Sequence, residues 1–588
     1  MPNPNFFAEL KRRNVLRVGA FYAAAGWLLV QIATQVFPFF DIANWVVRLV
    51  VVAVIVGFPF ALIFSWFYEL TPEGLKRESD IAPSASITRS TGKTLDRWII
   101  AVLALAVVVL LADKFVLHKN ADAALAKSIA VLPLVNESGD PQQDYFSDGL
   151  SEELISALGQ VHDLKVIGRN SSFQFRGRQQ DDSTAIGLKL GVATLLEGTV
   201  RKLGDQVRIV ASLINAADGS QLWSQTYDRE LKDVFAVQSE IATAVAGALK
   251  STLLGKVAES SDKPPDGNLG AYNALLQGNF YLNRLTEEDC RKAISYYDEA
   301  IRLDPRYALA YAGLSFAWRQ LASSWLDKVG ADAANAKARS AARTALALAP
   351  DLDQAHEALG WLLLTADLDV SAAEIEFRQA LALAPSAASP KNALSYALAF
   401  QGQREAAADL SRQVIALEPL RIGGYLNRAR VLTALGHYDE AEATLRKSIE
   451  LQPTASRQYV YLTTIDLLRG KADAALRDAQ REPEGFWRNY ALALAQQASG
   501  DQAAADAALE LLIEHDADAG PFQIAAVYAL RKDPDHAFEW LDRAYTDRDS
   551  GLTQLLVTPF LLAYKNDPRF AALCVKLKIP APGADTKP

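Results

Sequence analysis

Three aspartates recur at four-residue intervals in residues 128–158, SIAVLPLVNESGDPQQDYFSDGLSEELISAL. Asp140, Asp144 and Asp148 could offer carboxylate oxygens to a divalent cation, but a calcium loop places its ligands at alternate positions and ends with Glu. A phosphate-binding loop needs several glycines and a Lys, whereas NESGDPQQD has one Gly and no Lys. We therefore favour a turn followed by a helix start capped by Asp148 or Ser151, with metal or ligand binding as the alternative.

The other residues capable of chemistry are scattered. The six histidines stand at 118, 162, 356, 437, 515 and 536, and HEALG at His356 lacks the second His of a zinc-protease helix. Cys290 and Cys574 match no zinc-ligand spacing and are too few for a disulfide framework. The sequence contains no G-x-S-x-G elbow and no Walker motif. It predicts a protein that is not an enzyme, with no catalytic residue, metal or cofactor.

The elements around the aspartates predict a mixed α/β domain over residues 127–254. Apolar runs predict strands at 128–135, 164–168, 194–200, 206–215 and 220–227, with turns at Gly204-Asp205 and Asp218-Gly219. Alternation of Val207, Ile209, Ala211 and Leu213 with polar or smaller residues indicates a sheet with one packed face. Helical spacing predicts helices at 149–161 and 184–191, and a closing helix with Val234, Val237, Ile241 and Val245 on one face.

A repeating pattern follows a linker at residues 255–270. Pro350, Pro385, Pro419 and Pro453 are 34 or 35 residues apart, and Pro305 precedes them by 45 with an insertion. This period is typical of the tetratricopeptide repeat (TPR), a helix pair that stacks into a superhelix with a concave face. Gly402, Gly436, Gly470 and Gly500 are expected between paired helices, while Ala373, Phe377, Ala380, Ala441, Leu445 and Ser448 are expected to pack in second helices.

We predict seven to eight repeats over residues 271–546. A capping segment at 547–580 and a disordered tail at 581–588 follow. The repeat register places five polar or aromatic residues near the concave face: Asn392, Tyr396, Asn427, Arg430 and Tyr461. Asn can bind a peptide backbone, Arg can hold a carboxylate, and Tyr offers amphipathic contact area. This candidate peptide groove has one alternative, that the five residues are solvated or pack between repeats.

The α/β segment resembles a known family. SIAVLPLVNESGDPQQDYFSDGLSEELISALGQVHDLKVIGRNSSFQFRG, then LLEGTVRKLGDQVRIVASLINAADGSQLWSQTYDREL and VFAVQSEIA, are similar to the TolB N-terminal-like domain, which precedes TPRs in many bacterial proteins. FFAELKRRNVLRVGAFYAAAGWLLVQIA and FYELTPEGLKRES resemble the membrane leader of one branch of these proteins. Other branches carry a class III adenylate cyclase or a winged-helix domain ahead of the membrane. Because few residues precede the first apolar block, we expect neither domain here. The resemblance implies a non-enzymatic module for protein contacts.

Three apolar blocks predict transmembrane helices at residues 18–37, 45–67 and 98–117. Basic residues precede the first and third blocks, so the positive-inside rule places residues 1–17 and the loop 69–97, expected to be flexible, in the cytoplasm. The large C-terminal region is then periplasmic, in a multi-pass protein of the bacterial inner membrane. Gln31 with Gln35 and Gly19 with Ala23 could join spans, which leaves homo-oligomerisation open.

The formal net charge of −9 argues against nucleic-acid binding, which normally needs a basic surface. The predicted fold class is therefore multidomain, with N-terminal transmembrane helices, a TolB-N-like α/β domain and an all-α TPR superhelical solenoid. The favoured function is a membrane-anchored scaffold that binds a protein or peptide partner in the periplasm, in contact with the lipid bilayer. The alternative is a sensor whose periplasmic region binds a ligand and signals through the spans to a cytoplasmic partner.

Overall fold

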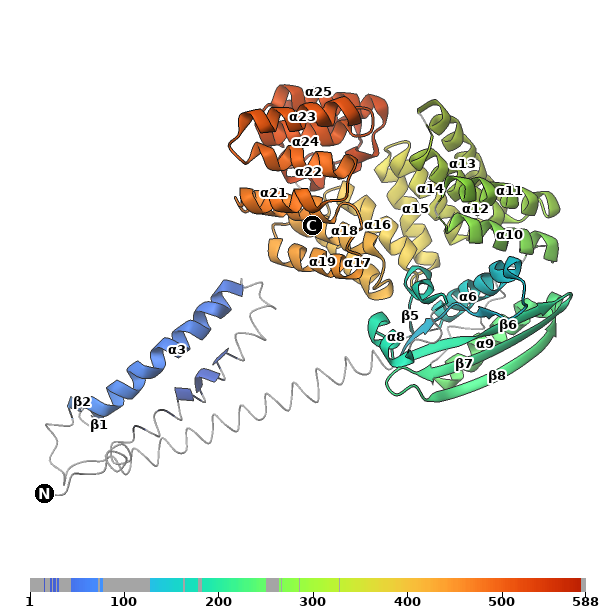
Figure 1. Cartoon of the computed structure of the whole chain (residues 1–588), viewed down its shortest axis with the longest axis horizontal. Coiled ribbons are helices and arrows are strands. Elements are labelled where there is room, and N and C mark those ends of the chain that lie inside the picture. Colours follow the sequence, from blue (N-terminus) through green and yellow to red (C-terminus); the bar gives the residue numbers. More distant parts are fainter. Residues whose placement is uncertain are drawn as a thin grey trace, which may run out of the picture. The chain divides into compact units, whose positions relative to one another are not determined.

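The computed structural model forms two compact units, Met1–Ala123 and Ala124–Pro588 (Figure 1). It describes residues 15, 19, 22, 23, 25–27, 29–30, 44–71, 74–77, 127–161, 164–177, 182–249, 264–265, 267–284, 286–326 and 328–582.

The first unit contains helix α3, Asn44–Phe67, followed by strands β1, Tyr68–Thr71, and β2, Gly74–Arg77. The two strands pair antiparallel, at the beginning of the predicted loop 69–97. Within the described part of the chain, none of the helices combines the length and the apolarity that crossing a bilayer demands. The predicted span 98–117 and most of 18–37 lie outside the described residues.

The second unit begins with a mixed sheet, of which strands β5, β6, β7 and β8 are labelled in Figure 1. The strand order is β5-β3-β6-β7-β8, with β4 paired to β6. Its strands are β3 Ser128–Val131, β4 Val135–Asn136, β5 Lys165–Val166, β6 Thr194–Leu203, β7 Gln206–Asn215 and β8 Gln221–Glu230. Strand β3 runs parallel to β5 and β6, whereas β6, β7 and β8 form an antiparallel meander. The predicted turns after β6 and β7 are confirmed, and Gly204 and Gly219 both adopt positive φ there.

Helices cover both faces of this sheet. On one face α6, Asp144–Gly159, and α9, Val234–Ala248, bury their apolar sides together with Ile209, Ala211 and Leu213 of β7. On the other face lie the short helix α7, Arg169–Ser172, and α8, Ser183–Leu190, around Ile186, Leu190 and Leu195. The predicted inward positions of β7 and α9 are confirmed, because burial follows the two periodicities read from the sequence.

Two local predictions in the aspartate stretch are wrong. The run 128–135 is not one strand, since it divides into β3 and β4 around Pro133, and proline cannot donate a ladder hydrogen bond. Helix α6 begins at Asp144, so Asp148 and Ser151 lie inside the helix and cap nothing. The earlier start buries Tyr145 and Phe146, and this tertiary burial outweighs the absence of a side-chain cap at Gln143.

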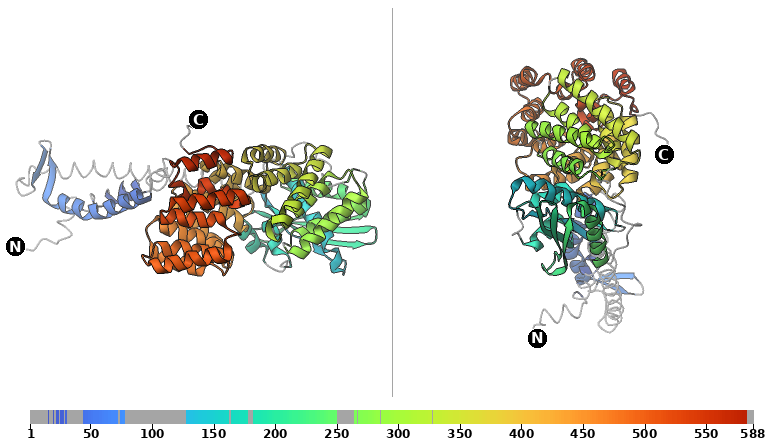
Figure 2. Two further views of the ribbon diagram at one scale, coloured as in Figure 1. Left: turned by 90° about the horizontal axis from the view of Figure 1, so that it is seen from above. Right: turned by 90° about the vertical axis from the view of Figure 1, so that its right-hand side faces the viewer.

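Helix pairs make up the rest of the unit, stacked in sequence order (Figures 1 and 2). The described chain contains eight pairs: α10 Leu269–Leu282 with α11 Glu287–Leu303, α12 Ala308–Ser324 with α13 Lys328–Leu348, α14 Asp353–Thr365 with α15 Val370–Leu383, α16 Ala388–Phe400 with α17 Arg404–Leu417, α18 Ile422–Ala434 with α19 Tyr438–Leu451, α20 Gln458–Leu468 with α21 Ala472–Arg481, α22 Phe486–Gln497 with α23 Gln502–Asp516, and α24 Pro521–Arg531 with α25 Pro534–Asp547. The first helices of successive pairs contact one another, which makes them the inner layer of the stack. The insertion after α12 lengthens α13 to 21 residues.

The small residues of the repeat act as predicted. Gly402, Gly436, Gly470 and Gly500 all have φ between 71° and 82° and stand between the two helices of a pair. Such a left-handed conformation ends a helix with little strain only when the residue is glycine. The second-helix positions named from the sequence are fully buried: Ala373, Phe377, Ala380, Ala441, Leu445 and Ser448.

The chain does not simply end the stack after α25. The 3-10 helix η7, Ser550–Val557, and the short helix α26, Pro559–Leu562, turn back over the inner layer and contact α14, α16, α18 and α24. Helix α27, Pro568–Lys576, then packs against α25. The segment 547–580 thus contains three helical elements. Only α27 continues the outer layer, which the second helices of the pairs form. The predicted tail 581–588 lies outside the described residues beyond residue 582.

Candidate functional site

A connected set of polar and aromatic side chains crosses four inner helices. On α14, Glu357 accepts hydrogen bonds from Trp361 Nε1 at 3.2 Å and from Ser389 Oγ of α16 at 2.6 Å. The guanidinium of Arg319 on α12 lies 5.6 Å from the Trp361 ring centroid. Trp361 in turn meets Tyr396 of α16 edge-on, with ring centroids 5.7 Å apart. We call Arg319, Glu357, Trp361, Ser389, Tyr396, Asn427 and Arg430 the inner network.

Helix α18 completes the inner network. Arg430 lies 5.1 Å from the Tyr396 ring centroid and donates from Nη2 to Asn427 Oδ1 at 2.8 Å. Asn427 Nδ2 donates to Ser395 Oγ at 2.9 Å. The guanidinium groups of Arg319 and Arg430 thus lie against the rings of Trp361 and Tyr396. Such cation–π contact stabilises each guanidinium and leaves N–H groups that can donate to a carbonyl or carboxylate.

Of the five residues predicted for the groove, Tyr396, Asn427 and Arg430 belong to the inner network. Arg430 contacts both Tyr396 and Asn427, and Asn392 is buried one turn before Tyr396 on α16. Tyr461 stands apart from the inner network, but it lines a cavity of about 40 Å³ with Arg430. Asn427 and Arg430 are only 2% and 6% exposed, so they are far less accessible than a free peptide groove would require.

Arg319, Glu357 and Trp361 were not predicted from the sequence. A signal for two of them was available, because Glu357 and Trp361 precede Asn392 and Tyr396 by 35 residues, the same offset that separates Pro350 from Pro385. Glu357 is 7% exposed, and burial raises the pKa of its carboxyl group, an effect opposed by the hydrogen bonds from Ser389 and Trp361. Burial likewise lowers the pKa of Arg319, opposed by the charge of Glu357.

A second set of contacts joins the α/β region to the repeats. The carboxylate of Glu418, which is 3% exposed, accepts hydrogen bonds from the backbone N–H groups of Ser171 at 2.8 Å and Asn170 at 3.3 Å. Ser171 Oγ accepts from Leu420 N at 3.0 Å, and Gly168 N donates to Leu417 O at 2.9 Å. We call this α7–Glu418 contact the joint. Sequence patterns do not reveal it, because its partners are almost 250 residues apart.

The α/β region also packs on the first repeat. Tyr272 and Leu276 of α10 belong to the same apolar core as α6 and α9. Gly149 of α6 permits this approach, because a Cβ there would lie 2.5 Å from Leu276 Cδ2. Contacts at the first repeat and at the α17–α18 turn therefore hold the α/β region against two separated parts of the array.

The aspartates of residues 128–158 have structural partners. Asp140 Oδ1 accepts from Gln142 N at 2.9 Å, and Asp144 Oδ1 accepts from Asn136 Nδ2 at 2.7 Å. Asp148 is buried and pairs with Arg176, while desolvation raises its pKa to about 6. Among the described residues no cluster of His, Cys, Asp and Glu has the geometry to hold a metal ion. The hydrogen bonds of the three aspartates favour the structural interpretation, in which Asp140 caps the 3-10 helix Pro141–Gln143.

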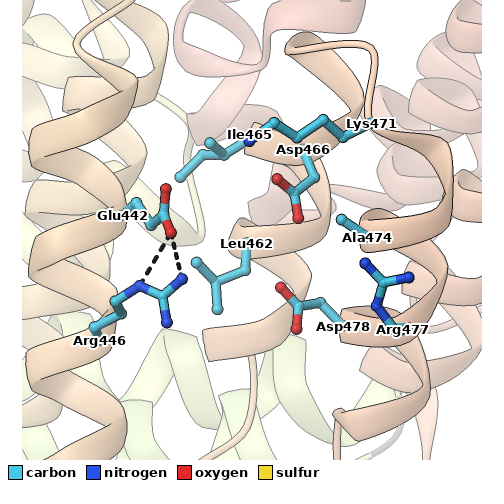
Figure 3. A pocket seen from close by; sticks show the side chains of 9 residues that line it. All are labelled: Glu442, Arg446, Leu462, Ile465, Asp466, Lys471, Ala474, Arg477 and Asp478. Carbon is cyan, nitrogen blue, oxygen red and sulfur yellow. Dashed lines mark hydrogen bonds and ion pairs between the residues drawn. The ribbon is translucent and has the colours of Figure 1, made fainter.

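A charged cavity of about 250 Å³ lies between α19, α20 and α21 (Figure 3). Its carboxylates are Glu442, Asp466 and Asp478, and Arg446, Lys471 and Arg477 bring as many cations. Glu442 accepts hydrogen bonds from Arg446 Nε at 3.0 Å and Arg469 Nη1 at 2.6 Å. Burial raises the pKa of Asp466 and of Asp478. Carboxylates and cations are equal in number in the lining, and Glu442 forms ion pairs with Arg446 on the same helix and with Arg469, which connects α19 to the end of α20.

Three comparisons relate the chain to known proteins. Residues 422–454 match the family model for the tetratricopeptide repeat. A protein of Rhizobium meliloti (strain 1021) named putative adenylate cyclase 3 is 38% identical over 191 residues, which are 32% of this chain and 32% of that protein. The chain thus spans about a third of the length of this curated relative.

The solved structures to which the chain is similar share little sequence with it. PilW, a type IV pilus biogenesis factor, is 20% identical, with a TM-score of 0.32 over 36% of this chain and 92% of PilW. Yeast Tom70 is 15% identical, with a TM-score of 0.32 over 52% and 67%. YrrB, described as a TPR protein with an unusual peptide-binding site, is 19% identical, with a TM-score of 0.22 over 31% and 87%. The matched repeat and the eight stacked helix pairs identify the helical region as a solenoid of tetratricopeptide-repeat type.

Proposed function

We propose that this protein is a membrane-anchored scaffold whose repeat array binds a protein or peptide partner on the periplasmic side of the bacterial inner membrane. The inner network is the observation that carries the proposal. It aligns Arg, Trp, Tyr and Asn side chains across α12, α14, α16 and α18, and these residue types are suited to hold peptide carbonyls and apolar side chains. Its groups donate and accept hydrogen bonds and stack on one another, so binding is the chemistry that it supports.

Photo-crosslinking tests whether the inner layer binds the partner. A photoreactive amino acid replaces half-buried Arg319 in one chain and Ile375, which is 69% exposed on α15, in another. In native membranes we expect protein adducts at position 319 and none at 375. Trp361→Ala, introduced with the probe at 319, should reduce the adducts at least tenfold. Adducts at 375 with none at 319 would place partner binding on the outer layer and refute the proposal for the inner network.

Membrane anchoring rests on the three apolar blocks and on the basic residues that flank the first and third. Alkaline phosphatase, which is active only in the periplasm, can be fused after residue 85 or after residue 265. We expect activity only for the fusion at 265. Activity at 85 with none at 265 would reverse the orientation, and inactivity of both fusions would remove the periplasmic assignment.

The α/β region has a proposed role of its own, as a TolB-N-like module for protein contacts. The joint also favours a second function, in which a ligand on the α/β region alters the array and signals through the spans. Because Glu418 and Ser171 connect the two parts through buried hydrogen bonds, a displacement of α7 would move the α17–α18 turn.

A further inference from the structure

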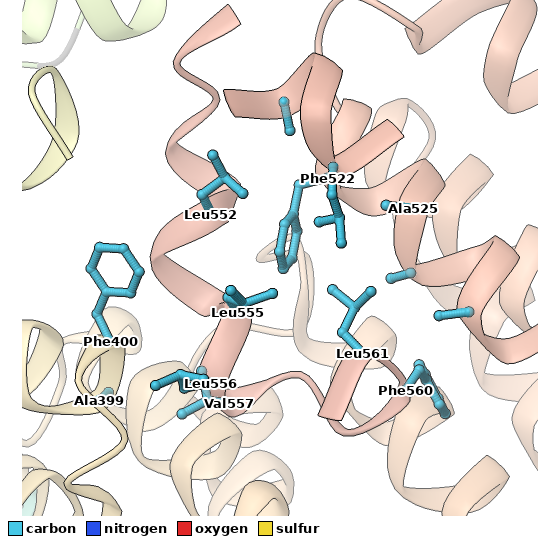
Figure 4. Packing of buried hydrophobic residues seen from close by; sticks show 14 of the residues in the cluster. Ala399, Phe400, Phe522, Ala525, Leu552, Leu555, Leu556, Val557, Phe560 and Leu561 are labelled. Atoms are coloured by element: carbon cyan, nitrogen blue, oxygen red, sulfur yellow. The ribbon is translucent and has the colours of Figure 1, made fainter. Parts of the chain in front are cut away.

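The segment that turns back over the inner layer buries most of its apolar side chains. Leu552 and Leu555 are fully buried, and Leu556, Val557 and Leu561 are at most 2% exposed (Figure 4). Phe522 of α24 and Phe400 of α16 lie among them in the same apolar cluster. The segment thus connects pairs three, four, five and eight across the inner layer.

Polar contacts fix the register of the segment. Arg404 Nε, at the start of α17, donates to Leu556 O at 3.0 Å. Asp549 accepts from Phe522 N at 2.9 Å and from Gly551 N at 2.8 Å, which holds the beginning of η7. Gly402 leaves room for Leu556, because a Cβ there would lie 3.2 Å from Leu556 Cδ1. A backbone carbonyl held by Arg and side chains seated in apolar sites are the features of peptide recognition.

The segment also meets the predicted groove residues. The cavity lined by Arg430 and Tyr461 is also lined by Gln554, Val557 and Phe560 of the segment. Arg430 is 6% exposed, and its Nε has no hydrogen-bond partner among the described residues. The inner layer thus presents an incompletely used Arg donor beside a chain segment that already occupies the groove.

We propose that the inner layer from α14 to α24 is a binding site for an apolar peptide and that residues 550–562 are its resident ligand. The expected ligand class follows from the segment: closely spaced Leu and Val side chains, a carbonyl for Arg404 and a Pro-Phe turn. The proposal deepens the scaffold function and rests on it, because a partner peptide of this class would have to displace the resident segment. A tethered ligand competes at high effective concentration, so the intact chain should bind such a peptide weakly.

The test uses the full chain and a fluorescent synthetic peptide of residues 549–563, DSGLTQLLVTPFLLA. Leu556→Asp weakens the resident segment, and we expect this variant to bind the peptide at least tenfold more tightly than the wild type. A peptide carrying the same Leu-to-Asp change should not bind. Ile375→Asp on the outer layer is the matched control and should bind like the wild type. Equal peptide affinity of Leu556→Asp and the wild type would overturn the proposal.

Hydrogen exchange of the wild type gives a second readout that does not depend on the folding of the variant. If the segment is displaceable, amides of residues 552–561 open at a lower free energy than those of α16 and α24. Exchange of all three only through a common unfolding would show that the segment is a fixed part of the core. Capture of the synthetic peptide without partner adducts at position 319 would support the resident-ligand site while refuting the scaffold function.

Discussion

At the scale of single residues, Asp148 shows how a suggestive carboxylate can be a feature of folding. It lies inside α6 with 3% of its surface exposed and accepts a hydrogen bond from Arg176. Desolvation raises its pKa to about 6, and the opposing effect of Arg176 is smaller. A perturbed carboxyl group often marks an active site, but here its partner is a neighbouring Arg of the same domain.

The raised pKa has a defined consequence for stability. The folded state binds a proton at Asp148 more tightly than the unfolded state, so the contribution to stability is fully present below about pH 4 and is lost as the pH rises through about 6. As the pH rises from 4 to 7.5, the wild type should lose roughly 2–3 kcal/mol of stability that Asp148→Asn does not lose. The free energy of opening of α6, obtained from hydrogen exchange of both proteins at the two pH values, measures this difference. A difference between the two proteins that is independent of pH would contradict it.

At the scale of elements, regular packing was predictable and local exceptions were not. The alternation in β7 and the 34-residue period report which side of a strand or helix is buried, and both are visible in a single sequence. The start of α6 was misplaced because burial of Tyr145 and Phe146 depends on tertiary contacts. The inner network was predicted in part, since Tyr396 and Arg430 follow the repeat register whereas Arg319 precedes an insertion.

Close packing of paired helices can be tested at Gly360. A Cβ at this position in α14 would lie 2.5 Å from Cε1 of fully buried Phe377 in α15. We expect Gly360→Ala to destabilise the protein by about 1–3 kcal/mol through overpacking. Gly423→Ala in α18 is the matched control, because its Cβ would meet nothing within 4 Å. This control should be neutral or gain up to ~1 kcal/mol from helix propensity. Thermal melts showing equal shifts for both variants would contradict the packing explanation.

At the scale of the whole second unit, the α/β region is held at the first repeat and at the joint. Two contacts on separated repeats restrain the part of the array between them, including the helices that carry Arg319 and Trp361. The α/β region therefore supports the geometry of the inner network even though it contributes no residue to it.

The joint offers a direct test of this restraint. Glu418→Ala removes the acceptor for Asn170 N and Ser171 N and should cost about 1–3 kcal/mol locally, because the buried N–H of Ser171 loses its hydrogen bond of 2.8 Å to the carboxylate. We expect faster hydrogen exchange in α7 and in the start of α18, with exchange in α22 unchanged. Asp409→Ala removes an exposed carboxylate from α17 and serves as the control, which should leave exchange in α7 as it is in the wild type. Unchanged exchange in α7 for Glu418→Ala would show that the joint does not hold the two parts together.

The return of residues 550–562 to α14 and α16 has a consequence for the order in which the protein is made. A ribosome completes the third and fourth pairs long before it reaches Leu555 and Leu556. Until then, Phe400 and its neighbours lack the side chains that bury them in the finished protein. Repeat arrays ordinarily fold by local propagation, each pair on the one before it. In this chain the middle pairs depend on the last-made segment, and a nascent or prematurely ended chain would expose an adhesive apolar surface. The middle of the array is then protected from aggregation when synthesis of the chain is complete, and not when each repeat is added.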